Sequence, residues 1–147
     1  MEAQRMPGHL IRRLHQVSTQ VFTRHIQEAG FDLTPVQFAA MDAITSNPGI
    51  DQAGVATRIA YDRATIGGVI DRLEQKGFVT RNVSTTDRRA REVWPTDRGV
   101  RAYDASLPVV DAVQDEILSG LSNVERARFL ELAAKALGGA SGETPGG

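Results

Sequence analysis

The chain has 147 residues, a length typical of one domain, and its 41% hydrophobic and 24% charged residues are typical of a globular protein. It contains no cysteine, which excludes disulfides, thiolate nucleophiles and cysteine-based zinc fingers. No apolar run approaches the ~20 residues of a membrane span, and the first residues lack the apolar core of a secretory signal, so we expect a cytoplasmic protein.

The net charge of −1 hides an uneven distribution of charge. Residues 58–101 carry ten basic and six acidic side chains, whereas residues 102–147 carry three basic and seven acidic ones. Fifteen of the 17 basic residues are arginine, which suits contacts with phosphates and guanine bases. A solvated surface is the commoner explanation of a charge cluster. The motifs inside residues 58–101 therefore have to decide between a solvated surface and a surface that binds nucleic acid.

The first two predicted elements are helices. An apolar stripe at helical spacing predicts a helix over residues 8–28. A capping box, with Thr34 as N-cap and Gln37 as its partner, predicts that a second helix begins at Pro35 and runs to about Ser46.

The next two predicted helices are short and joined by a tight turn. Asp51 is the expected N-cap of a helix over 52–60, and Asp62 is the expected N-cap of a helix over 63–76. Gly77 follows as the residue that ends this helix. Two short helices joined in this way form a helix-turn-helix.

A strand pair and two further helices complete the chain. Strands are expected over 78–83 and 90–94, on either side of a polar and basic turn. Thr96 caps a long helix that Pro108 should kink, and a capping box at Ser122 opens the last helix. The predicted fold class is therefore mainly α with a small β-hairpin wing, a winged helix-turn-helix.

The chain offers little chemistry for catalysis or metal binding. Its three histidines, His9, His15 and His25, point in three directions on one predicted helix and cannot share a metal ion. The sequence has no nucleophile elbow, phosphate loop or zinc-protease motif, and Gly67-Gly68 falls inside a helix. We therefore expect no enzyme activity, no metal and no cofactor.

The predicted helix over 63–76 offers a mechanism for reading DNA. The second helix of a helix-turn-helix presents its N-terminal residues to base edges in the major groove. Arg63 can contact guanine or phosphate, and Thr65 can donate to a base or touch a thymine methyl. Gly67 and Gly68 each cost about 1 kcal/mol of helix stability, which indicates a close approach either by DNA or by a neighbouring helix.

The turn between the two predicted strands carries Arg88 and Arg89, with Arg91 just beyond it. An arginine at the tip of a wing can enter the minor groove, whose negative potential attracts it. We expect Asp87 to orient a neighbouring guanidinium, that of Arg89 or Arg72, rather than to contact a phosphate. The candidate DNA-binding residues are Arg63, Thr65, Gly67, Gly68, Arg72, Arg88, Arg89 and Arg91.

Four segments, in order and spacing, resemble the MarR family of bacterial transcription regulators. They are Leu33-Thr34-Pro35-Val36-Gln37-Phe38, residues 70–81, Asp87-Arg88-Arg89 and Thr96-Asp97-Arg98-Gly99. The sequence departs from the family pattern at Pro95, where an apolar strand residue is usual, and at Gly67-Gly68, where polar residues are usual. The second strand is therefore expected to end before Pro95, and base contacts to be fewer.

The resemblance implies an intertwined helical homodimer. Residues 1–32 and 97–137 would supply the dimerisation helices, residues 33–99 would form the DNA-binding domain, and the glycine-rich residues 138–147 would form a disordered tail. Members of the family bind pseudo-palindromic operators, usually as repressors. Many release DNA when a small aromatic acid binds between the dimerisation helices and the winged domain, whereas the lack of cysteine disfavours the thiol-oxidation branch.

A ligand pocket is expected where the first helix meets the second. An aromatic acid needs an apolar slot for its ring and a cation or donor for its carboxylate. His15, or Arg12 one turn earlier, is the candidate for the carboxylate, with Ser18 as a further polar group, and Phe38 and Met41 are candidates for the ring wall. For each of these residues taken singly, packing in the dimer interface is at least as good an explanation as ligand binding.

Two functions follow from the sequence. The first is a dimeric DNA-binding repressor that a small aromatic acid releases from its operator. The alternative is a dimeric module that binds a small molecule or a protein and no longer binds DNA, which the departure at Gly67-Gly68 favours.

Overall fold

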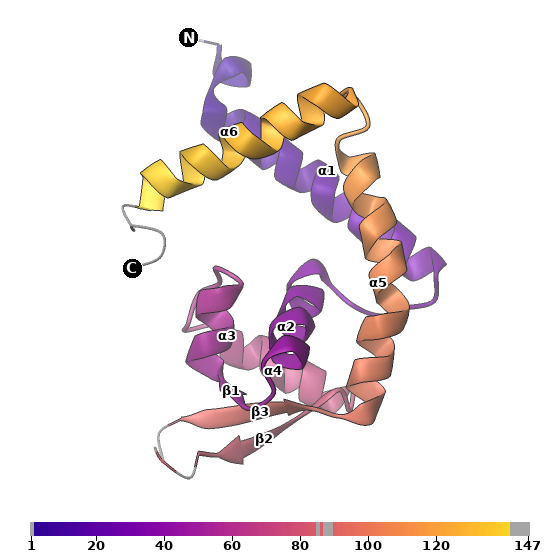
Figure 1. Ribbon diagram of the computed structural model, residues 1–147, viewed down its shortest axis with the longest axis vertical. Helices are drawn as coiled ribbons and strands as arrows, with labels where there is room; N and C mark the ends of the chain where they lie inside the picture. Colours follow the sequence, from indigo (N-terminus) through magenta and orange to yellow (C-terminus); the bar gives the residue numbers. More distant parts are fainter. Residues whose placement is uncertain (1, 85, 87–89, 142–147) are drawn as a thin grey trace. The chain divides into compact units, whose positions relative to one another are not determined.

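The computed structural model describes residues 2–84, 86 and 90–141 (Figure 1). In this part of the chain, helices predominate and three short strands form one antiparallel sheet, which confirms the predicted fold class. In chain order the elements are η1 (Ala3–Arg5), α1 (Pro7–Glu28), α2 (Pro35–Ser46), β1 (Ile50–Asp51), α3 (Gln52–Arg58), α4 (Ile66–Gln75), β2 (Val79–Val83), β3 (Arg91–Pro95), α5 (Asp97–Ile117) and α6 (Asn123–Ser141). The chain divides into two compact units, residues 1–113 and 114–147.

The first two helices lie where the sequence signals predict them. α1 begins one residue before the predicted start and buries Phe22 and Ile26. α2 begins with the predicted capping box, in which the Gln37 N–H donates to Thr34 Oγ1 at 3.1 Å and the Thr34 N–H donates to Gln37 Oε1 at 3.3 Å. Because these bonds satisfy N–H groups that the helix itself cannot pair, they define where α2 starts.

The third helix also begins at its predicted cap but ends early. The Gly54 N–H donates to Asp51 Oδ1 at 2.6 Å. α3 ends at Arg58, two residues before the predicted end, and Ala60 adopts a φ of +54°. This left-handed conformation is unfavourable for a residue with a Cβ, and it marks the sharp turn between α3 and α4.

The predicted start of α4 was wrong by three residues. Arg63, Ala64 and Thr65 form a turn, and the helix begins at Ile66. Asp62 caps this turn rather than the helix, because its carboxylate accepts from the Ala64 N–H at 2.9 Å and its carbonyl accepts from the Thr65 and Ile66 N–H groups. Aspartate favours both arrangements, so the local sequence did not distinguish them.

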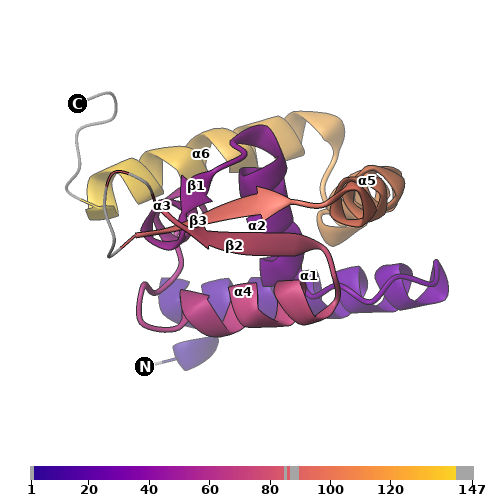
Figure 2. The same cartoon turned by 90° about the horizontal axis from the view of Figure 1, so that it is seen from below.

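The sheet has the strand order β1-β3-β2, and all pairs are antiparallel (Figure 2). β1 was not predicted, since two residues are too few to show an alternating pattern. The expectation that the second wing strand ends before Pro95 was wrong, because Pro95 pairs with Val79. β1 reaches only Val93 and Glu92, so Pro95 has a neighbouring strand on one side alone, where a missing N–H is tolerated.

Trp94 of β3 lies against Gly49, the residue before β1. Gly49 has a φ of +89°, and a Cβ built there would come within 2.8 Å of the Trp94 ring. Trp94 as a whole residue is nevertheless 40% exposed. A glycine is therefore required at position 49 both by the backbone turn and by the ring above it.

The start of α5 packs directly on the turn between α4 and β2. Thr96 caps the helix, as predicted: its Oγ1 accepts from the Gly99 N–H at 3.0 Å and donates to the Gly77 carbonyl at 2.6 Å. A Cβ at Gly99 would overlap the Phe78 carbonyl oxygen and lie 3.0 Å from Met41 Cε. Only a glycine allows this close approach.

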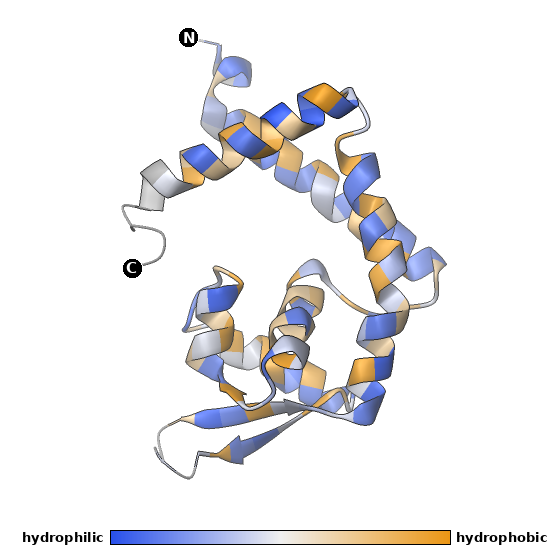
Figure 3. Ribbon diagram, viewed as in Figure 1, coloured by the Kyte–Doolittle hydropathy of each residue, from blue (hydrophilic) through white to orange (hydrophobic). Residues whose placement is uncertain are grey.

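The second unit contains α6, which opens with the predicted capping box. The Ser122 N–H donates to Glu125 Oε1 at 2.9 Å, and the Glu125 N–H donates to Ser122 Oγ at 3.2 Å. The bond from the Ser122 backbone holds the pKa of Glu125 below its usual value. α6 exposes large apolar side chains, among them Leu130 and Leu137, and the first unit exposes Ile11 on α1. Figure 3 shows hydrophobic and hydrophilic residues alternating along both α1 and α6.

Candidate nucleic-acid interface and ligand site

The side of α4 that faces solvent is the candidate for contact with DNA. The opposite side is buried, and it carries Ile66, Val69, Ile70 and Leu73. Among the candidates for DNA contact, Gly68 and Arg72 are exposed on α4, and Arg63 and Thr65 are exposed in the turn before it. These residues are therefore accessible to DNA, and α4 can enter a groove with this side.

The two glycines of α4 do not serve packing within the described part of the chain. A Cβ at Gly68 would meet nothing within 4 Å, and a Cβ at Gly67 would meet only Gln52 Nε2, at an ordinary distance of 3.7 Å. A neighbouring helix of the same chain therefore does not explain them.

The wing candidates are only partly described. Arg91 begins β3 and is exposed. Arg88, Arg89 and Asp87 lie outside the described residues.

An open groove with a volume of about 670 Å³ runs between the start of α2 and the outer side of α4. Thr34 and Gln37 line it from α2, and Gly68, Arg72 and Lys76 line it from α4 and its C-cap. The α4 side of the groove is polar and carries two cations, Arg72 and Lys76, and one carboxylate, Asp71. It therefore adjoins the surface that the sequence assigns to DNA.

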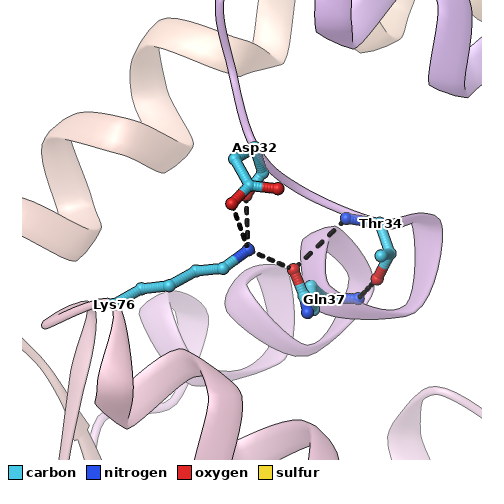
Figure 4. A network of polar contacts seen from close by, with 4 residues as sticks. All are labelled: Asp32, Thr34, Gln37 and Lys76. Carbon is cyan, nitrogen blue, oxygen red and sulfur yellow. Dashed lines mark hydrogen bonds and ion pairs between the residues drawn. The ribbon is translucent and has the colours of Figure 1, made fainter.

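Lys76 connects the end of α4 to the segment that leads into α2 (Figure 4). Its ammonium donates to the Asp32 carbonyl at 2.6 Å and to Gln37 Oε1 at 2.8 Å, and it lies 3.4 Å from the Asp32 carboxylate. Gln37 Oε1 also accepts from the Thr34 N–H, so the capping box of α2 is part of the same network. One ammonium with three donors thus holds the end of α4 against the start of α2.

A second cation, Arg81 of β2, holds the other side of α4. Its Nη2 donates to Asp71 Oδ1 at 2.5 Å and to Glu74 Oε1 at 3.1 Å, and its Nη1 donates to Gln52 Oε1 at 2.9 Å. The hydrogen bond to Glu74 raises the pKa of Arg81, although burial opposes this. No role was predicted for Arg81 or Lys76 from the sequence, because the partners of Arg81 lie seven to 29 positions away and those of Lys76 lie 39 and 44 positions away.

The candidate ring wall for an aromatic ligand contains an aromatic cluster. Phe38 of α2 is half-buried, with its ring centroid 5.3 Å from Tyr103 of α5 in a stacked arrangement and 6.2 Å from Phe22 of α1. The Tyr103 hydroxyl donates to the Asp42 carboxylate, which raises the Tyr103 pKa to about 12. This bond was not predicted from the sequence, because it joins residues 61 positions apart.

The other ligand candidates differ in how accessible they are. Arg12 and His15 are exposed on α1, and Ser18 is half-buried there. Ser18 and His15 precede Phe22 by about one and two helical turns, so they follow the same side of α1. Met41 is only 1% exposed, which places its side chain in the core.

The described residues contain no group of three or more histidine or acidic side chains that could hold a metal ion. Among them there is also no helix long and apolar enough to cross a membrane.

Comparison with known proteins identifies the family. A family model described as "MarR family" matches residues 33–90. The chain is also 34% identical over 127 residues to the transcriptional regulator HosA of Escherichia coli, over 86% of this chain and 91% of HosA. The chain belongs to the MarR family.

Solved structures of other DNA-binding regulators share the fold of this MarR-family protein. The structure of Bordetella bronchiseptica BpsR, whose DNA binding is regulated by 6-hydroxynicotinic acid, matches 92% of this chain and 96% of its own at 26% identity, with a TM-score of 0.85. The transcriptional repressor CouR, bound to a 23-mer DNA duplex, matches 92% of this chain and 95% of its own at 25% identity, with a TM-score of 0.82. This MarR-family protein is therefore a winged helix-turn-helix transcriptional regulator.

Proposed function

We propose that this protein represses transcription by binding a pseudo-palindromic DNA operator as a homodimer, and that a small aromatic acid releases it. The observation that carries the proposal is the accessible side of α4, where Gly68 and Arg72 are exposed and the preceding turn exposes Arg63 and Thr65. The second helix of a helix-turn-helix uses this side in the major groove. A repressor works on the chromosome, so we place the protein in the bacterial cytoplasm.

Each candidate residue has a defined role in this proposal. Arg63 and Thr65 read base edges, and Arg72 contacts a phosphate. Gly67 and Gly68 let the backbone of α4 approach the DNA closely. In the wing, Arg88, Arg89 and Arg91 contact phosphates and the minor groove.

The homodimer is supported by apolar side chains that each unit leaves in solvent. Leu10 and Ile11 of α1 are 48% and 64% exposed, and Leu130 and Leu137 of α6 are 62% and 71% exposed. Exposed apolar surface of this kind marks an interface. A second copy of the chain is the proposed partner, because a dimer is needed to read both halves of a palindrome.

The effector site is proposed beside the aromatic cluster of Phe22, Phe38 and Tyr103. Phe38 would contact the ligand ring, and Met41 would support it from the core. His15 or Arg12 would bind the carboxylate, with Ser18 as a further donor. BpsR, which responds to 6-hydroxynicotinic acid, supports an aromatic acid as the ligand class. Release of DNA requires that the ligand bind better to a dimer whose two α4 helices do not fit the operator spacing.

Selection from a library of random DNA duplexes tests the proposal, because it requires no operator sequence to be chosen in advance. We expect the protein to enrich a pseudo-palindromic sequence, with an affinity that falls steeply as salt rises. Hydroxylated benzoic and nicotinic acids at millimolar concentration should then release the selected duplex. A protein that enriches no sequence and binds no duplex at low salt does not have this function.

The same experiment separates the second candidate function, a dimeric binding module that has lost DNA binding. The exposed Gly68 favours this candidate, because a side chain that could read bases is absent there. Calorimetry with the same aromatic acids would then show ligand binding in a protein that enriches no duplex.

A further inference from the structure

Arg81 is placed where it can control how α4 meets DNA without touching DNA itself. It lies in the middle of β2, where it pairs with Val93 of β3, so its backbone is part of the wing. Its side chain is only 13% exposed and reaches two carboxylates on α4, those of Asp71 and Glu74. It also reaches Gln52, the first residue of α3. One guanidinium therefore joins the wing to both helices of the helix-turn-helix.

Stability alone does not explain an arginine at this position. Its Nε atom is buried and has no hydrogen-bond partner among the described residues, which costs free energy. A buried ion pair is often no more stabilising than well-packed apolar side chains of similar volume. A methionine would fill the same space without the unpaired nitrogen. The arginine supplies what an apolar side chain cannot, namely directional bonds to three residues at once.

The partners of Arg81 lie next to the surface proposed for DNA. Asp71 lines the open groove together with Gly68 and Arg72. The side chains of Asp71 and Glu74 are 52% and 44% exposed. At about 0.1 M salt a charge is felt over about 10 Å, so both carboxylates would act on phosphates that α4 approaches.

We propose that Arg81 is a positioning residue for DNA recognition, which fixes α4 against the wing and binds the carboxylates of Asp71 and Glu74. This inference rests on the proposed function, because it assumes that α4 and the wing contact the same duplex. With Arg81 in place, α4 contacts the bases while it is held at one angle to the wing. Without Arg81, the angle between α4 and the wing is no longer fixed. The affinity for the preferred duplex then falls more than the affinity for random DNA.

The test measures the ratio of two affinities, for the duplex selected by the wild-type protein and for a random duplex of equal length. For Arg81→Met we expect this ratio to fall by about tenfold or more, the effect of a lost specific contact. Arg101→Met removes one exposed positive charge from α5 and serves as the charge-matched control, for which the ratio should stay within about twofold of wild type.

A second pair of variants keeps the test valid if Arg81→Met does not fold. The double variant D71A/E74A removes both acceptors, whereas D71N/E74Q removes the same two charges but keeps amide oxygens that accept from Arg81. Both should bind random DNA more tightly than wild type, because two negative charges are lost. Only D71A/E74A should lose discrimination.

The outcomes distinguish this inference from the proposed function. If the wild-type protein enriches no duplex, the proposed function fails and this inference fails with it. If the wild-type protein does enrich a duplex, equal ratios for D71A/E74A and D71N/E74Q show that the hydrogen bonds of Arg81 to α4 do not set discrimination, and the inference is overturned. A ratio for Arg81→Met equal to that for Arg101→Met overturns it as well.

Discussion

Gly68 and Gly99 occupy the same position, the third residue, of α4 and α5, and alanine at each should have opposite effects. In both helices the added methyl raises helix propensity, which contributes about 0.5 kcal/mol or slightly more. At Gly68 the methyl enters open space. At Gly99 it overlaps the Phe78 carbonyl oxygen and lies 2.9 Å from the Phe78 carbonyl carbon. Backbone atoms cannot rotate away as a side chain can.

The size of the effect at Gly99 follows from how tightly Phe78 is held. Its carbonyl accepts from the Thr96 N–H at 3.0 Å, so moving it strains the cap of α5 as well. Overpacking typically costs 1–3 kcal/mol, and we expect about 3 kcal/mol net at this site. For a chain of this size, a change of 1 kcal/mol in the free energy of unfolding shifts the Tm by about 3 °C. Gly99→Ala should therefore lower the Tm by about 9 °C, whereas Gly68→Ala should raise it by about 2 °C.

Thermal unfolding followed by circular dichroism, at one protein concentration, measures both shifts. A Tm for Gly99→Ala within about 2 °C of wild type would refute the close approach of α5 to Phe78. A Tm for Gly68→Ala below wild type would refute the open surface at α4. Under the proposed function, Gly68→Ala should also bind the selected duplex more weakly although it folds more stably.

Three further predictions concern the ligand site and the turn before α4. The hydrogen bond from Tyr103 to Asp42 raises the Tyr103 pKa from 10 to about 12, so its stabilising effect should be complete below pH 10 and lost as pH rises to about 12. Unfolding of wild type and Tyr103→Phe should therefore differ below pH 10 and converge above pH 12. Ala60→Gly should raise the free energy of unfolding by about 1 kcal/mol in denaturant titrations, because it relieves a positive φ. The His15→Ala variant should bind the selected duplex normally, but an at least about tenfold higher concentration of aromatic acid should be needed to release it, as expected for a lost carboxylate contact. Release at the same concentration as for wild type would exclude His15 from the site.

Features encoded by neighbouring residues could be predicted from the sequence. The capping box of Thr34 and Gln37 is an example, since each partner lies within one helical turn of the other. The start of α4 was misplaced because Asp62 favours a turn as readily as a helix cap. The bonds of Arg81 to Gln52 and of Tyr103 to Asp42 join residues 29 and 61 positions apart, and no periodicity reveals such pairs. The candidate DNA-binding residues near α4 could be named from the predicted fold class. The roles of Lys76 and Arg81, which hold α4, could be identified only from the structure.

The packing of Trp94 on Gly49 gives this protein a built-in optical reporter. Trp94 is the only tryptophan in the chain, so all indole fluorescence comes from β3. Its ring rests on the backbone of Gly49 on one side, and the residue is partly exposed to water, which makes its emission wavelength sensitive to a change in local hydration. Under the proposed function, duplex binding that covers the wing would shift this emission. The affinity for an unlabelled duplex could then be measured from the intrinsic fluorescence of the protein.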